Sequence, residues 1–244
     1  MKKKAYIILF LLLSAVTASL MTILITNLFN LEKNGIAFYE ISRSGKEVNE
    51  IEFHNQVPIG DINFIELGED SPNIIEARWD VNFKGFIDVE KCILITYHTN
   101  GSCFLIEVSC NTEPTLITKL NLTISFNINY STYSFISDSQ KGNTNLIASD
   151  LTLKKVNFKA SSGNVNLRLN RSNIVEDLEV MTDTGDIKLI LDLSNFSKNL
   201  ICYSNSGFQY VDIWDIRFKS MANLNVSTLI GYIEVMWAHH FNKS

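Results

Sequence analysis

Several side chains that could take part in catalysis lie at fixed distances after glycines that recur along the chain. Equivalent positions after each glycine would form a column in a stacked fold. The third position after successive glycines holds Asn166, Lys188, Tyr210 and Glu234. The fifth position holds Arg168, Ile190, Asp212 and Met236. A parallel β-helix can carry a polysaccharide-cleaving site on such an outward face, but this chemistry needs paired carboxylates in distinct environments. No such pair is seen, so we expect no enzyme and keep a carbohydrate-active enzyme as an alternative.

Metal and cofactor chemistry is not indicated either. The chain has four histidines, which are His54, His98, His239 and His240. None has a Cys, Asp or Glu partner at a metal-ligand spacing. Asp183 and Asp186 lack the Gly-Gly-x-Gly-x-Asp repeat that binds calcium in β-rolls, which makes them turn residues. There is also no Gly-x-Ser-x-Gly or Walker loop, so we expect no catalytic residue, metal or cofactor.

The repeat itself indicates how these columns are positioned. Five glycines lie 21, 22, 22 and 24 residues apart, at Gly142, Gly163, Gly185, Gly207 and Gly231. Apolar or small residues precede each glycine at −7, −5 and −3 and follow it at +2, +4 and +6. This pattern describes two half-buried strands that meet at a corner, where glycine allows a positive φ or a close approach.

Two architectures are compatible with this period. Equivalent positions carry similar residues, and parallel stacking in register produces that similarity directly, whereas a sandwich of antiparallel hairpins pairs unlike strands. We therefore predict an all-β fold, a parallel β-solenoid of about five 22-residue coils over residues 135–238, with a tail at 239–244. Residues 36–134 also form strands by their alternation, and we expect them to be a β-rich part of the same ectodomain.

The amino end predicts a membrane segment. Residues 5–29 contain no charge and are long enough as a helix to span the ~30 Å hydrocarbon core. Lysines in residues 1–4 should stay cytoplasmic, which places the rest outside the cell membrane after a short stalk at 30–35. The alternative to this single-pass signal anchor is a cleaved signal peptide that ends at Ala18.

The rest of the chain after the three leading lysines is acidic, with 18 Lys and Arg against 26 Asp and Glu. This balance argues against nucleic acid as a partner.

Export would permit two modifications. Seven Asn-x-Ser/Thr triplets are candidate glycosylation sites of a glycoprotein, at Asn100, Asn121, Asn129, Asn170, Asn195, Asn225 and Asn242. Cys92 and Cys110 flank an expected hairpin with a turn at Asn100-Gly101, and they could form a disulfide. That turn places Cys92 opposite Ser109, so the bridge would need a change of register. Cys202 is expected to be a buried free thiol.

Aromatic residues gather at outward positions of the last coils. This candidate binding surface comprises Tyr203, Phe208, Tyr210, Trp214, Tyr232 and Met236. Exposed apolar patches mark interaction sites, although these rings could instead pack against residues 36–130 or cap the solenoid.

Two units carry a family resemblance. Ser161–Leu167 and Asp183–Leu189 are similar to the Ser-x-Gly-Asp-Ile-x-Leu coils of the putative-adhesin family, and Ile59–Phe64 resembles that family's opening unit. Gly207-Phe208 and Gly231-Tyr232 depart from it by lacking Asn or Asp after glycine. The resemblance implies a membrane-associated β-solenoid of unknown function and no catalytic residues. We expect an adhesin-like binding or structural module whose partner is an envelope protein or surface glycan. The alternative is an accessory or sensor subunit of an envelope signalling complex.

Overall fold

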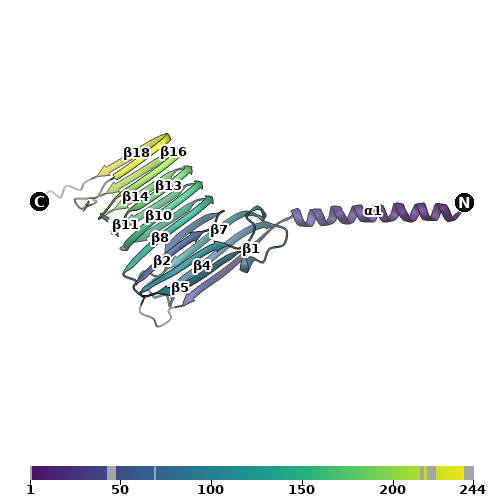
Figure 1. The fold of residues 1–244 in the computed structure, drawn as a ribbon, viewed down its shortest axis with the longest axis horizontal. Coiled ribbons are helices and arrows are strands. Elements are labelled where there is room, and N and C mark those ends of the chain that lie inside the picture. Colours follow the sequence, from purple (N-terminus) through teal and green to yellow (C-terminus); the bar gives the residue numbers. More distant parts are fainter. Residues whose placement is uncertain (1, 43–47, 69, 215–216, 219–223, 239–244) are drawn as a thin grey trace.

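The computed structural model describes residues 2–42, 48–68, 70–214, 217–218 and 224–238, and it confirms the all-β solenoid (Figure 1). One helix, α1 (Lys2–Asn30), precedes the strands. The strands are β1 Glu32–Ser42, β2 Glu50–Gln56, β3 Asp61–Glu66, β4 Asn73–Lys84, β5 Ile93–Asn100, β6 Cys103–Cys110, β7 Ile117–Phe126, β8 Thr132–Lys141, β9 Thr144–Ser149, β10 Thr152–Ser162, β11 Val165–Asn170, β12 Asn173–Ile174, β13 Leu178–Thr184, β14 Ile187–Asp192, β15 Asn195–Phe196, β16 Leu200–Trp214, β17 Arg217–Phe218 and β18 Leu224–Ala238. The predicted tail at 239–244 and His239 and His240 lie outside the described residues.

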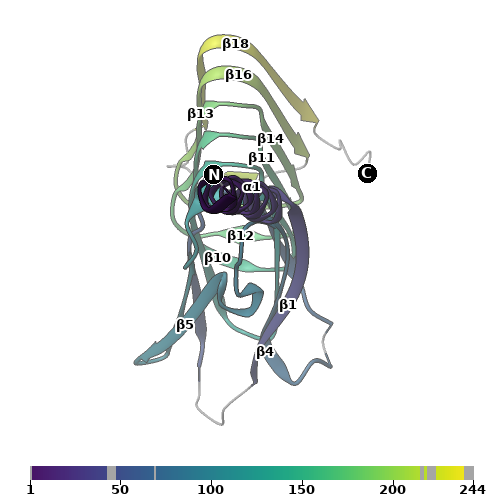
Figure 2. The same ribbon diagram turned by 90° about the vertical axis from the view of Figure 1, so that its right-hand side faces the viewer.

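Each coil contributes one strand to each of two faces. Along the first face, β6, β2, β8, β10, β13, β16 and β18 pair in parallel, and along the second face β7, β3, β9, β11, β14, β16 and β18 do the same. Figure 2 shows the two faces from the side, with β13 on one and β14 on the other. The short strands β12, β15 and β17 pair on a third side. Parallel stacking of equivalent strands excludes the hairpin sandwich.

The register is the one that the glycine repeat predicts. Leu189 pairs with Leu167 on one side and with Val211 on the other, and all three side chains are buried. Alternation along each strand therefore sends one set of residues into the core and the next set out to solvent. This alternation is what positions the outward columns.

The glycines form a column at the corner between the two faces. Gly60 begins it, and the five repeat glycines follow, each one stacked on the carbonyl group of the glycine in the preceding coil. A β-carbon at Gly185 would lie less than 3.0 Å from the carbonyl oxygen of Gly163, and its φ is +148°. The corner thus requires glycine both for its backbone conformation and for the close approach of the next coil.

Residues upstream of the repeat extend the same stack. Strands β2 and β3 lie between β6–β7 and β8–β9, although β6 and β7 come later in the sequence. Antiparallel strands β1, β4 and β5 then cover the amino-terminal end. The stalk expected at residues 30–35 is mostly strand, because Glu32–Gly35 of β1 pair with Val81–Lys84 of β4.

Helix α1 extends away from the strands (Figure 1). Its segment Leu13–Asn30 is long and apolar enough to cross a membrane, and none of it is buried in the protein. Its last turn contacts the strand region through Phe29, whose ring centroid lies 5.3 Å from that of Phe86. One amino-terminal apolar helix is therefore present, with the properties of either a membrane anchor or a signal peptide.

Candidate binding surface

The second strand of the last coils presents three rings on its outer side. Val211 and Val235 point toward the core side of β16 and β18, so the residues beside them point outward. The rings of Phe208 and Tyr232 lie parallel, with centroids 5.5 Å apart and an interplanar angle of 5°. Tyr210 stacks on Phe208 at 6.5 Å. We call Phe208, Tyr210 and Tyr232 the aromatic face.

Charged groups surround the aromatic face. Lys188 Nζ lies 5.7 Å from the centroid of the Tyr210 ring, within cation–π range. Tyr210 Oη donates a long hydrogen bond of 3.4 Å to Asp212 Oδ2. Desolvation and the neighbouring Asp212 carboxylate raise the pKa of Tyr210, so its phenol stays a neutral donor. Asp212 Oδ1 is buried and has no hydrogen-bond partner among the described residues.

A polar depression of about 350 Å³ adjoins the aromatic face. It is lined by Ile147, Ala148, Ser149, Arg168, Leu169, Asn170, Ile190 and Asp192. It meets the aromatic face where Ile190 of β14 pairs with Asp212 of β16. The Arg168 and Asp192 side chains are exposed and offer both a donor and an acceptor.

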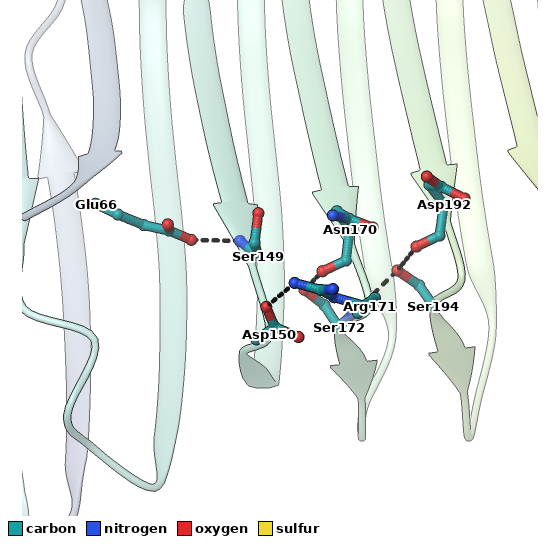
Figure 3. Close-up of polar contacts among 8 residues, drawn as sticks. All are labelled: Glu66, Ser149, Asp150, Asn170, Arg171, Ser172, Asp192 and Ser194. Carbon is teal, nitrogen blue, oxygen red and sulfur yellow. Dashed lines mark hydrogen bonds and ion pairs between the residues drawn. The ribbon is translucent and has the colours of Figure 1, made fainter. Parts of the chain in front are cut away.

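One end of this depression is formed by turns that repeat from coil to coil (Figure 3). Asp150, Arg171 and Leu193 occupy equivalent positions and have φ values of 58°, 49° and 50°. Arg171 bridges to the Asp150 carboxylate of the preceding coil at 2.6 Å. Because this pair is exposed, we assign it a role in turn alignment rather than in stability.

Serine hydroxyl groups complete the same turns (Figure 3). Ser172 Oγ donates to the Asn170 carbonyl, and Ser194 Oγ donates to the Asp192 carbonyl. In the coil before them, the Ser149 amide donates to the Glu66 carboxylate. Partial burial raises the pKa of Glu66, and the bond from Ser149 opposes that shift. These contacts fix the backbone that lines the depression.

The six aromatic and Met residues predicted as a surface do not all come together. Phe208, Tyr210 and Tyr232 form the aromatic face, and Met236 lies next to Asp212 on the neighbouring strand. Tyr203 is on the other face of the solenoid, where its hydroxyl group bonds to Asn205. The side chain of Trp214 lies outside the described part of the structure.

A cluster of potential ligands arises between strands that sequence spacing does not connect. Carboxylate oxygens of Glu50 and Glu52 and the Cys103 sulfur lie within 4.8 Å of one another, and His54 contacts Glu52. This cluster forms because β2 pairs with β6, and the spacing of these residues in the sequence does not predict that pairing. Lys154 Nζ lies 2.7 Å from Glu50 and supplies positive charge there, so we assign no metal to it.

The two cysteines predicted to pair are close in space. The turn of the β5–β6 hairpin is at Gly101-Ser102 rather than at Asn100-Gly101, because Asn100 pairs with Cys103. This register places Ile93 opposite Cys110 and brings the neighbouring Cys92 thiol near the Cys110 thiol, which donates a hydrogen bond of 3.3 Å to the Thr112 carbonyl. The interaction between the two thiols lowers the pKa of Cys110 to about 6 and raises the pKa of Cys92. Burial raises the pKa of the Cys202 thiol to about 12.

We expect Cys92 and Cys110 to form a disulfide when the folded protein meets a two-electron oxidant such as diamide, which takes up the two thiol protons and two electrons. The lowered pKa of Cys110 makes it the attacking thiolate above pH 6. Peptide mapping without reduction should find this crosslink, and Cys92→Ser should abolish it. A bridge to Cys103 instead would contradict the prediction.

The candidate glycosylation sites differ in exposure. Asn100, Asn129 and Asn225 are exposed, whereas Asn121, Asn170 and Asn195 are half-buried. Asn242 is outside the described residues. Modification at these positions stays a prediction.

Comparisons with known proteins bear on the fold. No protein-family profile matches the chain, and no match is found among curated proteins. A crystal structure of a "putative cell adhesion protein" from Clostridium sporogenes is similar, with a TM-score of 0.51 and 13% identity over 84% of this chain and 100% of that chain. A "putative adhesin" from Bacteroides fragilis covers 84% of this chain and 97% of its own at 14% identity, with a TM-score of 0.37. At this identity the Clostridium structure supports the solenoid fold that the chain shares with it.

Proposed function

We propose that this protein is a membrane-anchored, extracytoplasmic module of the adhesin type, which binds a surface glycan through the aromatic face and the adjoining polar depression. The observation that carries the proposal is the parallel stack of Phe208 on Tyr232, which lies beside the depression that Arg168 and Asp192 line. The Clostridium structure, a "putative cell adhesion protein", supports it by similarity of fold.

Carbohydrate chemistry fits this surface. A sugar ring has an apolar C–H face and a rim of hydroxyl groups, so it is complementary to a flat aromatic platform edged by hydrogen-bonding groups. The aromatic face supplies the apolar ring surface, and Arg168 and Asp192 supply donors and acceptors in the adjoining depression. Five coils contribute to this surface, so an extended oligosaccharide could contact it along the stack.

The membrane part of the proposal depends on α1. An uncharged apolar segment that is unburied in the protein is expected to partition into a bilayer. The lysines at its amino end favour a cytoplasmic start, which would hold the solenoid outside. The full chain should therefore stay in the membrane pellet after a carbonate wash, and a soluble product that begins at Ser19 would contradict anchoring.

The binding test uses the full chain in nanodiscs on an array of bacterial and host glycans. The double variant Phe208→Ser with Tyr210→Ser should lose binding by roughly 30-fold or more, since even a single aromatic anchor commonly contributes about 2 kcal/mol. Tyr203→Ser is the matched control, because it removes a ring from the other face. Full binding by the double variant, or equal loss in the control, would contradict the proposed surface. A large fall in melting temperature of the double variant would show instead that the rings are structural packing.

A further inference from the structure

β18 is the last strand of the solenoid that the structure describes. Strand β18 pairs with β16 on one side, and its other edge has no strand partner among the described residues. Exposed edge strands are usually protected from pairing by charges, proline or a bulge. The 15 residues of β18 contain no proline and one charged residue, Glu234. Within the part of the chain that the structure describes, this edge therefore lacks these protections.

The core is also open at this end. Val235 is 43% exposed, whereas Val211 and Leu189, which occupy the same position in the two preceding coils, are fully buried. On the outer side near the corner, Leu229 and Ile230 add apolar surface that is 74% and 66% exposed. The opposite end is covered by β1 and β4. An apolar end of this kind is the mark of a surface that binds a partner.

The sequence of β18 is complementary to itself. The inward positions are 224, 226 and 228 before the corner at Ile230-Gly231, and 233, 235 and 237 after it, by their pairing with buried residues of β16. Two copies of the strand can pair in antiparallel fashion with Ile230 of one copy opposite Gly231 of the other. In this register, the numbers of any two residues that lie opposite each other add up to 461. Val226 then faces Val235 of the other copy and Thr228 faces Ile233, so each inward position meets an inward position.

The outward side chains match in the same way. Leu229 faces Tyr232, and the charged Glu234 faces the neutral Ser227, so no like charges oppose each other. The corner divides the pairing region into two arms of seven residues, 224–230 and 231–237, so both arms of the bent strand can pair at once.

We propose that two copies of this protein associate end to end through antiparallel pairing of their β18 strands about a two-fold axis. Such an isologous contact closes after two copies and extends one core into the next. Helix α1 and β18 lie at opposite ends of the molecule (Figure 1). The pair would therefore carry its two helices at opposite ends, which suits contact between two membranes; this last step rests on the proposed anchoring, whereas the pairing itself does not.

Analytical ultracentrifugation of the full chain in detergent, produced without N-glycosylation, tests the pairing. We expect a dimer, and we expect Val235→Lys to lower its association constant at least tenfold, because two ammonium groups would enter the joined core. Val175→Lys is the matched control, since Val175 is 38% exposed on an inner coil. A wild-type monomer at 50 μM protein, a larger open-ended assembly, or a dimer that survives Val235→Lys would overturn the proposal.

Charge exchange tests the register. Ser227→Glu places a carboxylate opposite Glu234 of the other copy and should weaken the dimer about fivefold, and adding Glu234→Lys should restore it. Failure of this rescue would overturn the register.

The Phe208→Ser, Tyr210→Ser variant separates the two proposals, because it should remain dimeric while losing glycan binding. Nanodiscs that each hold one copy should associate in pairs if the contact bridges two membranes, and a dimer found only within one disc would refute that step.

Discussion

Gly185→Ala is expected to unfold the central coils. A β-carbon there would lie less than 3.0 Å from the carbonyl oxygen of Gly163, which is backbone held in place by the strand ladders around it. The φ of +148° adds a conformational cost for any residue with a β-carbon. Since neither coil can move without breaking its neighbours, we expect a loss of about 4 kcal/mol or more, near the whole stability of many domains. Circular dichroism during urea titration would measure it.

Gly101→Ala provides the comparison for that experiment. Gly101 also has a positive φ, of +61°, but nothing lies within 4 Å of the position that its β-carbon would take. Its substitution should cost only the conformational term, about 1–2 kcal/mol. If both variants lost the same stability, the glycine column would be a matter of backbone conformation alone, and the close stacking of the coils would not be needed.

The repeat could be recognised from the sequence because each coil restates the same local requirements. Gly163 and Gly185 need the same corner, and Leu167 and Leu189 fill the same layer of the core, so a spacing pattern encodes the register directly.

Asn and Asp residues after these glycines have a further role that spacing alone did not reveal. Asn164 Oδ1 accepts the amide of Asp186 at 2.8 Å, and Asp186 Oδ1 accepts the amide of Phe208 at 2.8 Å. The change to phenylalanine ends this ladder where the aromatic face begins.

The order of the upstream coils could not be predicted in this way. Strand β2 lies between β6 and β8 because its inward side chains, Ile51 and Phe53, fit a layer that already contains Phe135. The Phe53 and Phe135 rings stack at 5.1 Å with an interplanar angle of 5°. Such pairing joins residues about 80 positions apart, and no local pattern specifies it. The antiparallel strands at the amino-terminal end are non-local for the same reason.

The candidate surface was only partly predictable. Successive side chains of a strand point to opposite sides, so Phe208 and Tyr210, two positions apart, must lie on the same side. The 24-residue step between the last two glycines then places Tyr232 beside Phe208. Tyr203 lies before the corner, and the turn of the chain at Gly207 sends it to the other face. The pairing of Asp212 with Ile190 at the rim of the depression depends on the stack rather than on any motif. An aromatic residue therefore belongs to this surface only if it also lies after the corner glycine, so residue type alone was a weaker predictor than position in the coil.

Leu189→Asp is expected to abolish the fold, through burial of a charge. Leu189 is fully buried between Leu167 and Val211, and no described cation lies within this apolar layer. The substitution removes a large apolar side chain, which alone costs about 2–5 kcal/mol, and it adds an unpaired carboxylate or forces its protonation. We expect a loss above 5 kcal/mol at pH 7, with partial recovery at pH 4 because protonation removes the charge. Thermal melts at the two pH values measure both effects.

Lys188→Asp is the control one residue away. Lys188 is exposed on the outer side of β14, where its only described interaction is the cation–π contact with Tyr210. Reversing this charge should cost within about 0.5–1 kcal/mol, which is the range for exposed sites and exposed cation–π pairs. The difference between the two variants reports the inward and outward alternation of β14 directly. Comparable losses would mean that Leu189 does not point into the core, and the register from which both the aromatic face and the self-pairing of β18 are argued would then be incorrect.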